Sequence, residues 1–296
     1  MTWYNSDMFK KIVIFGVGLI GGSVALALKK QPHAPHIVGL GRSVHSLQDA
    51  LQLGLIDRAE TEVASALQDA DLVMIATPVA QTPAILRSIL PHLNASTVIT
   101  DAGSTKSDVM AYATAELGDK LSQFVGAHPI AGAEKSGPAA AMADLYVGKN
   151  VILTPDANTS STAIEKVTAL WQQCGAVVSN MSPQEHDRVF AAVSHLPHLL
   201  AFALVEDLAK RDNAELLFKF AASGFRDFTR IAGSHPEMWR DIALANKTAL
   251  LGELKSYQQA LGEMTTLLEQ ADGNALQALF EHASRARNDW AKSKIQ

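Results

Sequence analysis

The feature that most constrains the fold of this chain is a glycine-rich segment near the N-terminus, Gly16-Val17-Gly18-Leu19-Ile20-Gly21. It follows the apolar run Ile12–Phe15 and precedes a helix predicted over Gly22–Lys30. In a strand-turn-helix unit, such glycines allow a tight turn, close approach of a pyrophosphate to the backbone, and close packing of helix on strand. The helix N-terminus then receives the anion. The pattern predicts a dinucleotide site formed by Gly16, Gly18, Leu19, Ile20 and Gly21, and the alternative is a glycine-rich turn without a ligand.

Strand-like and helix-like segments alternate through the first half of the chain. Apolar runs predict strands over Ile12–Phe15, Ile37–Leu40, Leu72–Ile75, Thr97–Thr100 and Phe124–Ala127, with further strands in Tyr146–Pro155 and Ala176–Ser179. This alternation is typical of a parallel sheet whose two faces are covered by helices. We therefore predict an α/β Rossmann-type domain over residues 1–180. Thr77 follows one of these strands at the sheet edge and is a further candidate for binding the cofactor.

From about Pro183 onward the apolar residues recur at helical spacing. One such set is Leu199, Leu200, Ala203, Leu204 and Leu208. This period is that of an amphipathic helix, and strand signals are few. We predict an all-α domain over residues 181–296. Helical domains of this size often complete their core by association, so we expect a homodimer formed through this domain.

Composition and charge exclude several classes of protein. The chain has 25 Lys+Arg against 30 Asp+Glu, a net charge of −5 without long runs of either sign, which argues against a nucleic-acid partner. The uncharged run Ile12–Leu28 is short for a membrane span, holds four glycines and lacks a signal-peptide cleavage site. The single cysteine, Cys174, excludes an intramolecular disulfide and is expected to be buried. We expect a cytoplasmic protein that binds small molecules, not membranes.

The end of the second predicted strand bears on the choice of dinucleotide. NAD sites carry an Asp or Glu about 20 residues beyond the glycine loop, where this chain has Gly41-Arg42-Ser43. Without the acid there is no repulsion against a 2′-phosphate, and Arg42 and Ser43 offer a guanidinium and a hydroxyl to bind it. We predict NADP as the preferred cofactor, with NAD possible. The alternative is that Arg42 is a solvated residue at a helix start and that either cofactor is accepted.

Four segments further along the chain carry candidate catalytic residues. They are Asp101-Ala102-Gly103-Ser104-Thr105-Lys106, the segment Gly126–Gly137 with its His-Pro-x-x-Gly pattern, Val193-Ser194-His195-Leu196-Pro197-His198, and the segment Gly224–Ala232 with its Phe-x-Asp-x-Thr-Arg pattern. In this order they closely resemble the prephenate/arogenate dehydrogenase family of tyrosine biosynthesis. The resemblance implies oxidation of a cyclohexadienol, in which the hydride passes to a nicotinamide and the ring carboxylate leaves as CO2 to give a phenol.

That chemistry needs a base on the hydroxyl proton, and a neutral imidazole suits the task. The resemblance implies that the base is His128, which follows a predicted strand and is therefore expected at the carboxyl edge of the sheet. The alternative for His128 is a core histidine bonded to backbone. The resemblance further implies that Ser104 bonds the substrate hydroxyl and orients it with His128. Ser104 could also be the N-cap of the following helix, and both roles can coexist.

The remaining candidates are expected to bind the substrate. The resemblance implies that Arg230 clamps the ring carboxylate, as a guanidinium can do with two hydrogen bonds. Arg226, one turn earlier, either faces the same side or is a surface residue. We assign His198 to the substrate side chain. Glu134 is expected to tune His128 or gate the pocket and Trp239 to form an apolar wall, although either could be ordinary scaffold.

Other interpretations of the same residues fit less well. His195 and His198 lie three apart in a helix that Pro197 is expected to interrupt, but no third ligand has suitable spacing, so no metal site is predicted. A β-hydroxyacid dehydrogenase would need a lysine in a Gly-x-x-x-Lys helix pattern, which we do not find. An NADP-sensing regulator would have no reason to retain the base and the carboxylate clamp.

The preference between prephenate and arogenate stays open at this level. The residues after position 250 look helical. We therefore expect no fused regulatory domain, and feedback by tyrosine would act at the active site as a product-like competitor.

Overall fold

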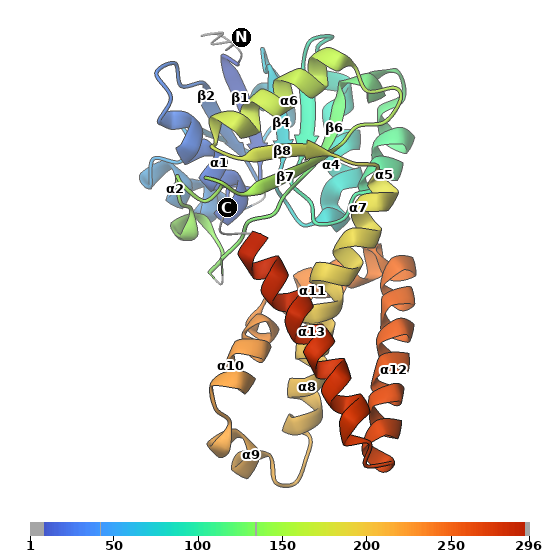
Figure 1. Cartoon of the computed structure of the whole chain (residues 1–296). Helices are drawn as coiled ribbons and strands as arrows, with labels where there is room; N and C mark the ends of the chain where they lie inside the picture. Colours follow the sequence, from blue (N-terminus) through green and yellow to red (C-terminus); the bar gives the residue numbers. More distant parts are fainter. Residues whose placement is uncertain (1–8, 42, 134, 294–296) are drawn as a thin grey trace. The chain divides into compact units, whose positions relative to one another are not determined.

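The computed structural model describes residues 9–41, 43–133 and 135–293. The chain forms two compact units, Met1–Lys247 and Thr248–Gln296 (Figure 1). The division at residue 181 expected from the sequence concerns fold type rather than compactness, and it remains a prediction.

The first unit is built on a sheet in which eight strands of the described chain have the order β3-β2-β1-β4-β5-β6-β7-β8 (Figure 1). The neighbours from β3 to β6 pair in parallel, whereas β7 is antiparallel to β6 and β8 is parallel to β7. The strand order reverses between β1 and β4, and ligands bind at such a point in open α/β sheets. The strands are β1 Lys11–Phe15, β2 His36–Leu40, β3 Arg58–Glu60, β4 Leu72–Ile75, β5 Val98–Asp101, β6 Phe124–Pro129, β7 Asn150–Thr154 and β8 Val177–Asn180.

The Rossmann-type fold expected from the sequence is confirmed, with two differences in the strands. β3 was not predicted, because Arg58-Ala59-Glu60 offers no apolar run. β7 departs from the parallel direction expected of the sheet. Among the described residues between β6 and β7 there is only the short 3₁₀ turn η4, Pro138–Ala140. A parallel return usually runs through a helix that crosses one face of the sheet, and the described part of this connection has no such helix, so the strand comes back antiparallel.

Helices cover both faces of the sheet. Along β1, Ile12 and Ile14 belong to one buried cluster and Val13 and Phe15 to another. The first cluster includes residues of α1 and α6, and the second includes residues of α4 and α5. Because both faces are covered, the strand is apolar at every position rather than alternating. These helices are α1 Leu19–Lys29, α2 Val44–Gln52, α3 Val63–Leu67, α4 Thr82–Ile89, α5 Ser107–Leu117 and α6 Ser161–Gln173.

Beyond the sheet, the first unit continues in one long helix, Pro183–Ala209. It consists of α7 Pro183–Phe190, the π-helical turn η5 Ala191–His195, and α8 Leu196–Ala209. The expected interruption at Pro197 was wrong. A proline inside a helix lacks an N–H and its ring crowds the carbonyl four residues earlier. The wide π turn immediately before Pro197 changes the local hydrogen-bond pattern, and the helix passes through.

Length and composition alone would allow this helix to cross a membrane, since its most apolar window has a mean hydropathy of 1.6. Its buried face nevertheless carries the polar residues His186, Asp187 and His195. Asp187 accepts hydrogen bonds from the backbone at the start of α5. These contacts make it a packing helix of the first unit, which ends with α9 Ala214–Phe220, α10 Ser223–Thr229, the 3₁₀ turn η6 Arg230–Gly233 and α11 Pro236–Ala245.

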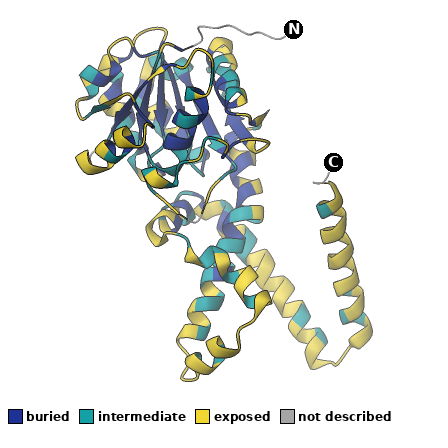
Figure 2. Ribbon diagram, turned by 90° about the vertical axis from the view of Figure 1, so that its left-hand side faces the viewer, coloured by how far each residue is buried: buried dark blue, intermediate teal, exposed yellow. Residues whose placement is uncertain are grey.

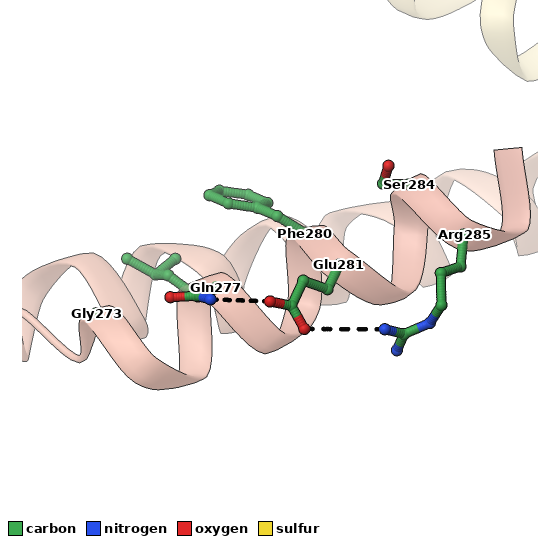
Figure 3. A pocket seen from close by; sticks show the side chains of 7 residues that line it. Gly273, Gln277, Phe280, Glu281, Ser284 and Arg285 are labelled. Atoms are coloured by element: carbon green, nitrogen blue, oxygen red, sulfur yellow. Dashed lines mark hydrogen bonds and ion pairs between the residues drawn. The ribbon is translucent and has the colours of Figure 1, made fainter. Parts of the chain in front are cut away.

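The second unit contains nearly all of α12, Lys247–Glu269, and the whole of α13, Gly273–Ser293. Figure 2 shows both helices coloured exposed along most of their length, in contrast to the strands of the sheet. Figure 3 shows a shallow hollow along α13 beside Phe280, where Gln277 donates to Glu281 over 2.8 Å and Arg285 lies 3.8 Å from Glu281. All of its lining residues come from this one helix, so the hollow is part of an exposed helix face rather than an enclosed cavity.

Candidate active site

The glycine loop has the geometry of a phosphate cradle. The chain turns at Gly16, with φ +88°, where a Cβ would lie 2.7 Å from the carbonyl oxygen of Ala76. A Cβ at Gly21 would lie 2.4 Å from the carbonyl oxygen of Gly16, so helix and strand can approach only with glycine there. A Cβ at Gly18, the N-cap of α1, would meet no atom within 4 Å. The position of Gly18 is therefore open, and it precedes the N–H groups of Leu19 and Ile20 at the helix start, where an anion is favoured.

Thr77 lies beside this cradle, just after β4. Its methyl carbon would be 2.9 Å from a Cβ at Gly16. Its hydroxyl is buried and makes no hydrogen bond within the described chain. A buried hydroxyl without a hydrogen bond beside the glycine turn is a polar group that a bound dinucleotide could satisfy, and the N–H donors at the start of α1 suit the phosphates of that cofactor.

Of the two residues expected to determine the preference between NADP and NAD, the structure describes Ser43 but not Arg42. Arg42 lies outside the described residues. Ser43 is the N-cap of α2, and its hydroxyl accepts a hydrogen bond from the Ser46 N–H over 3.2 Å. This gives Ser43 a structural role at the helix start, and its contact with a 2′-phosphate stays a prediction.

His128 lies near the carboxyl end of β6, within a chain of polar side chains. The strand extends beyond the predicted limit at Ala127 because His128 and Pro129 pair with β7. Nδ1 of His128 lies 2.8 Å from Nε2 of His186, and Nδ1 of His186 lies 2.9 Å from a carboxylate oxygen of Asp187. The partner of His128 Nδ1 is thus an imidazole and not a backbone group.

The imidazoles of His128 and His186 both favour the neutral form. Burial lowers the pKa of His128 well below its ordinary value, and the charges of His186 and Lys106 act in the same direction. Burial also lowers the pKa of His186, against the opposing hydrogen bond to Asp187. For Asp187, burial acts to raise the pKa, but hydrogen bonds from His186 and the start of α5 leave it below its ordinary value. A neutral imidazole beside a charged carboxylate is suited to accept a proton.

A buried ion pair lies close to these histidines. Lys106 is fully buried, and its ammonium group pairs with the carboxylate of Asp101 at the end of β5. Asp101 also accepts hydrogen bonds from the N–H groups of Gly103, over 2.8 Å, and Ala127, over 3.0 Å. A buried ion pair is stabilised when its remaining hydrogen-bonding groups are satisfied, and for Asp101 the backbone supplies those partners.

Ser104 lies in the loop between β5 and α5. The N-cap of α5 is Lys106, so the N-cap role considered for Ser104 was wrong. The side chain of Ser104 is partly exposed, and its hydroxyl forms no hydrogen bond to any described residue. The loop leaves this hydroxyl free for a ligand because the backbone of Lys106 and Ser107 is held by Asp187 instead.

The predicted substrate-binding residues that the structure describes form a second group. The rings of His198 and Trp239 stack with their centroids 3.6 Å apart. Burial lowers the pKa of His198, and the positive charge of Arg230 adds to this effect, which places Arg230 within electrostatic range of His198. Arg230 begins η6, which packs against α8. Glu134 lies outside the described residues, so its role as gate or tuning group stays a prediction.

Arg226 and His195 lie outside this group of substrate-binding candidates. Arg226 is exposed in α10, and its nearest acid is its neighbour Asp227, at 3.5 Å. This favours the surface role for Arg226. His195 is buried with Nδ1 3.1 Å from the amide nitrogen of Asn246, whereas Nδ1 of His198 lies 2.9 Å from the carbonyl oxygen of Ser194. The two histidines therefore do not share a partner.

Sequence analysis missed His186 and Asp187. The signal that could have found them is the helical spacing of the buried residues in α7, namely Pro183, His186, Asp187 and Phe190. Positions i, i+3, i+4 and i+7 form one face of a helix. Polar residues at two of the four buried positions indicate hydrogen-bonding partners inside the protein.

Comparisons with known proteins agree on one family. The model described as prephenate dehydrogenase, nucleotide-binding domain, matches residues 24–180, and that described as prephenate dehydrogenase, dimerization domain, matches residues 182–282. Prephenate dehydrogenase of Bacillus subtilis is 41% identical over 285 residues, covering 96% of this chain and 76% of the relative. Cyclohexadienyl dehydrogenase of Zymomonas mobilis is 35% identical over 284 residues, covering 95% of this chain and 96% of the relative.

Solved structures give the same result. Prephenate dehydrogenase from Aquifex aeolicus, in complex with hydroxyphenyl propionate and NAD+, matches with a TM-score of 0.88 and 38% identity over 94% of this chain and 98% of that one. Arogenate dehydrogenase from Synechocystis matches with a TM-score of 0.81 and 29% identity, covering 95% of this chain and 99% of the Synechocystis chain.

The cradle can be tested with two glycine substitutions. Gly21→Ala forces a Cβ against the Gly16 carbonyl oxygen, so we expect it to lower the free energy of unfolding by about 1–3 kcal/mol. Gly18→Ala meets open space, so we expect the unfolding free energy to stay within about 0.5 kcal/mol while dinucleotide affinity falls ~10-fold or more. Denaturant titration and calorimetry with NAD and NADP measure the two effects. Unchanged dinucleotide binding by the Gly18→Ala variant would contradict the cradle.

Proposed function

The chain belongs to the prephenate dehydrogenase family, and on this premise we propose that it oxidatively decarboxylates prephenate, arogenate or both in tyrosine biosynthesis. The products are 4-hydroxyphenylpyruvate from prephenate and tyrosine from arogenate. The observation that carries the proposal is the position of His128, a histidine with a lowered pKa at the carboxyl end of β6, in the same sheet as the glycine cradle.

The residues of this chain supply proton removal and substrate binding. A bound nicotinamide dinucleotide supplies the hydride acceptor. His128 accepts the proton of the substrate hydroxyl while hydride leaves the ring carbon that bears this hydroxyl. The lowered pKa of His128 keeps its imidazole unprotonated at neutral pH. Ser104, with its unbonded hydroxyl, orients the substrate hydroxyl toward His128. The C–C bond to the ring carboxylate then breaks, CO2 leaves, and the electron pair passes through the ring to the carbonyl oxygen, which takes the proton back from His128 to give the phenol.

We assign substrate binding to the second group of residues. Arg230 holds the ring carboxylate with its guanidinium until that group departs. His198 contacts the substrate side chain, and the stacked Trp239 forms an apolar wall and limits the motion of the imidazole. Glu134 closes the pocket or tunes His128.

For the cofactor we propose NADP in preference to NAD. The support comes from β2, which ends at Leu40 and is followed by Gly41-Arg42-Ser43, without the acid that bonds the ribose 2′-hydroxyl in NAD sites. The Aquifex aeolicus relative was solved with NAD+, so NAD remains the alternative cofactor in this proposal. We propose a cytoplasmic location, which agrees with a single cysteine, Cys174, that has no second cysteine in the sequence to form a disulfide.

The proposed function is tested by one set of assays. Purified protein is mixed with each of the two substrates and each of the two dinucleotides, and reduced nicotinamide is followed by absorbance. We expect turnover with at least one substrate, and kcat/KM ~10-fold or more higher with NADP than with NAD, since a charged hydrogen bond to the 2′-phosphate is worth about 1.5–3 kcal/mol. Silence with both substrates would end the assignment, and a preference for NAD would end the cofactor proposal alone.

The two residue roles predict different kinetic signatures. His128→Asn removes the base, so we expect kcat to fall by about 10²–10⁴-fold with little change in substrate affinity. Arg230→Gln removes the carboxylate clamp, so we expect mainly KM to rise, by ~10-fold or more. Arg226→Gln, in an exposed arginine of α10, is the matched control and should resemble wild type. A wild-type rate in His128→Asn would remove His128 as the base.

We also propose a homodimer formed through the helical region. The family model that matches residues 182–282 is described as a dimerization domain. In the same region large apolar side chains are exposed in α9, α12 and α13: Leu216, Phe218, Phe220, Tyr257, Leu261, Leu268 and Phe280. Such side chains are normally covered when they are this numerous, and a second copy of the chain would cover them.

The dimer predicts a mass in solution twice that of the chain, measured by size-exclusion chromatography with light scattering. Leu261→Glu combined with Phe280→Glu places charges on the exposed faces of α12 and α13, and we expect it to shift the protein toward monomer. The control is Val44→Glu, at an equally exposed apolar position of α2 in the sheet region. A monomeric wild type would overturn the proposal.

A further inference from the structure

We propose that His186 and Asp187 are a positioning pair that fixes the tautomer of His128 and stabilises the positive charge it acquires, a role that rests on the proposed function of His128 as the base. Neither residue belongs to the segments that carry the family resemblance. Both lie in α7 and are almost completely buried, at 0% and 5% exposed. In the part of the chain that the structure describes, His186 contacts His128 and Asp187 contacts His186, so the pair acts on the reaction by positioning.

The hydrogen-bond geometry assigns each proton. One carboxylate oxygen of Asp187 accepts from the N–H of Lys106 over 2.8 Å and faces Nδ1 of His186 at 2.9 Å, while the other accepts from the N–H of Ser107 over 2.8 Å. A carboxylate that receives these donors is ionised and can only accept. His186 therefore donates from Nδ1, which leaves a lone pair on its Nε2.

The lone pair on His186 Nε2 in turn fixes the tautomer of His128. Nδ1 of His128 lies 2.8 Å from that nitrogen, so it must carry the proton and donate it. Nε2 of His128 is then the unprotonated nitrogen. The opposite tautomer of His128 would place two lone pairs face to face, unless His186 turned an acceptor toward the Asp187 carboxylate.

The charges around the pair explain why Asp187 matters after proton transfer. Lys106, at the start of α5, disfavours protonation of both imidazoles, and it is paired with Asp101 of β5. His195 of η5 is held neutral, because burial lowers its pKa to about 4. Asp108 of α5 also faces Asp187, and burial raises its own pKa. Among these described groups, Asp187 is the anion bonded to the imidazole chain, so it stabilises the protonated His128 through His186.

A purely structural role is the competing explanation, because Asp187 also holds the first turn of α5. His186 separates the two possibilities, since its bonds are to His128 and Asp187 and not to α5. Phe190 provides a packing control. Its ring contacts His128 and His186 at centroid distances of 4.9 and 4.5 Å without hydrogen bonding.

The kinetic test compares His186→Leu, His186→Gln and Phe190→Leu. We expect His186→Leu to lower kcat by about 10–100-fold with little change in KM, as for other groups that orient a reacting residue. In wild type the acid limb of the kcat/KM profile should lie below pH 6.5, and in His186→Leu it should shift, because the protonated His128 loses both its acceptor and the imidazole whose charge lowers its pKa. His186→Gln retains an acceptor and should recover part of the rate. Phe190→Leu should leave the acid limb in place.

A substrate-free readout keeps this test separate from that of the function. With ¹⁵N-labelled histidine, the imidazole shifts of His128 should report a protonated Nδ1 and an unprotonated Nε2 in wild type, and a mixture of tautomers in His186→Leu. A protonated Nε2 in the wild type would overturn the positioning role even in an active enzyme. Equal acid limbs in wild type and His186→Leu would also overturn it. The expected tautomer in a protein that turns over neither substrate would instead reject the function alone.

Discussion

The structure of the site depends on the carboxylate of Asp187. Its oxygens accept hydrogen bonds from the N–H groups of Lys106 and Ser107, the N-cap and first residue of α5, and face the imidazole of His186, while its backbone carbonyl accepts the side-chain amide of Asn246 over 2.7 Å. One side chain thus joins the long helix of the helical region to the loop after β5. The desolvation of a buried charge is unfavourable unless such donors surround it. The need to satisfy this charge keeps the helical region in register with the sheet.

The fold could be predicted from the sequence wherever burial leaves a simple pattern. Strands covered on both faces give continuous apolar runs, so β1 and β4 were found almost to the residue. β3 escaped because it is short and carries Arg58 and Glu60. The direction of β7 could not be foreseen from its apolar residues, because direction depends on the connection and not on side-chain pattern.

The site residues that lie in a recognisable motif could be predicted from the sequence. Their hydrogen-bond partners could not be predicted where these come from distant parts of the chain. His128 lay in a recognisable segment, but its bond to His186 joins positions 58 residues apart. Lys106 and Asp101 lay inside one of the recognised segments, yet their pairing depends on both side chains turning inward, one from the end of β5 and the other from the start of α5. Ser104 looked like an N-cap because the helix was expected to start earlier. The carboxylate of Asp187 does that work instead, from another helix, and this leaves the hydroxyl free.

The π turn at Ala191–His195 has a consequence for how the two groups of residues face one another. An α-helix rotates by about 100° per residue, and a π turn holds one residue more than an α turn. The extra residue therefore changes the angular phase between His186, before the turn, and His198, after it. Loss of one residue from this turn would restore a regular α-helix and would rotate His198 by about 100° around the helix axis relative to His186. The phase of this helix, rather than its length, sets which side chains share the site, so family members that differ by one residue in this turn should differ in substrate contacts.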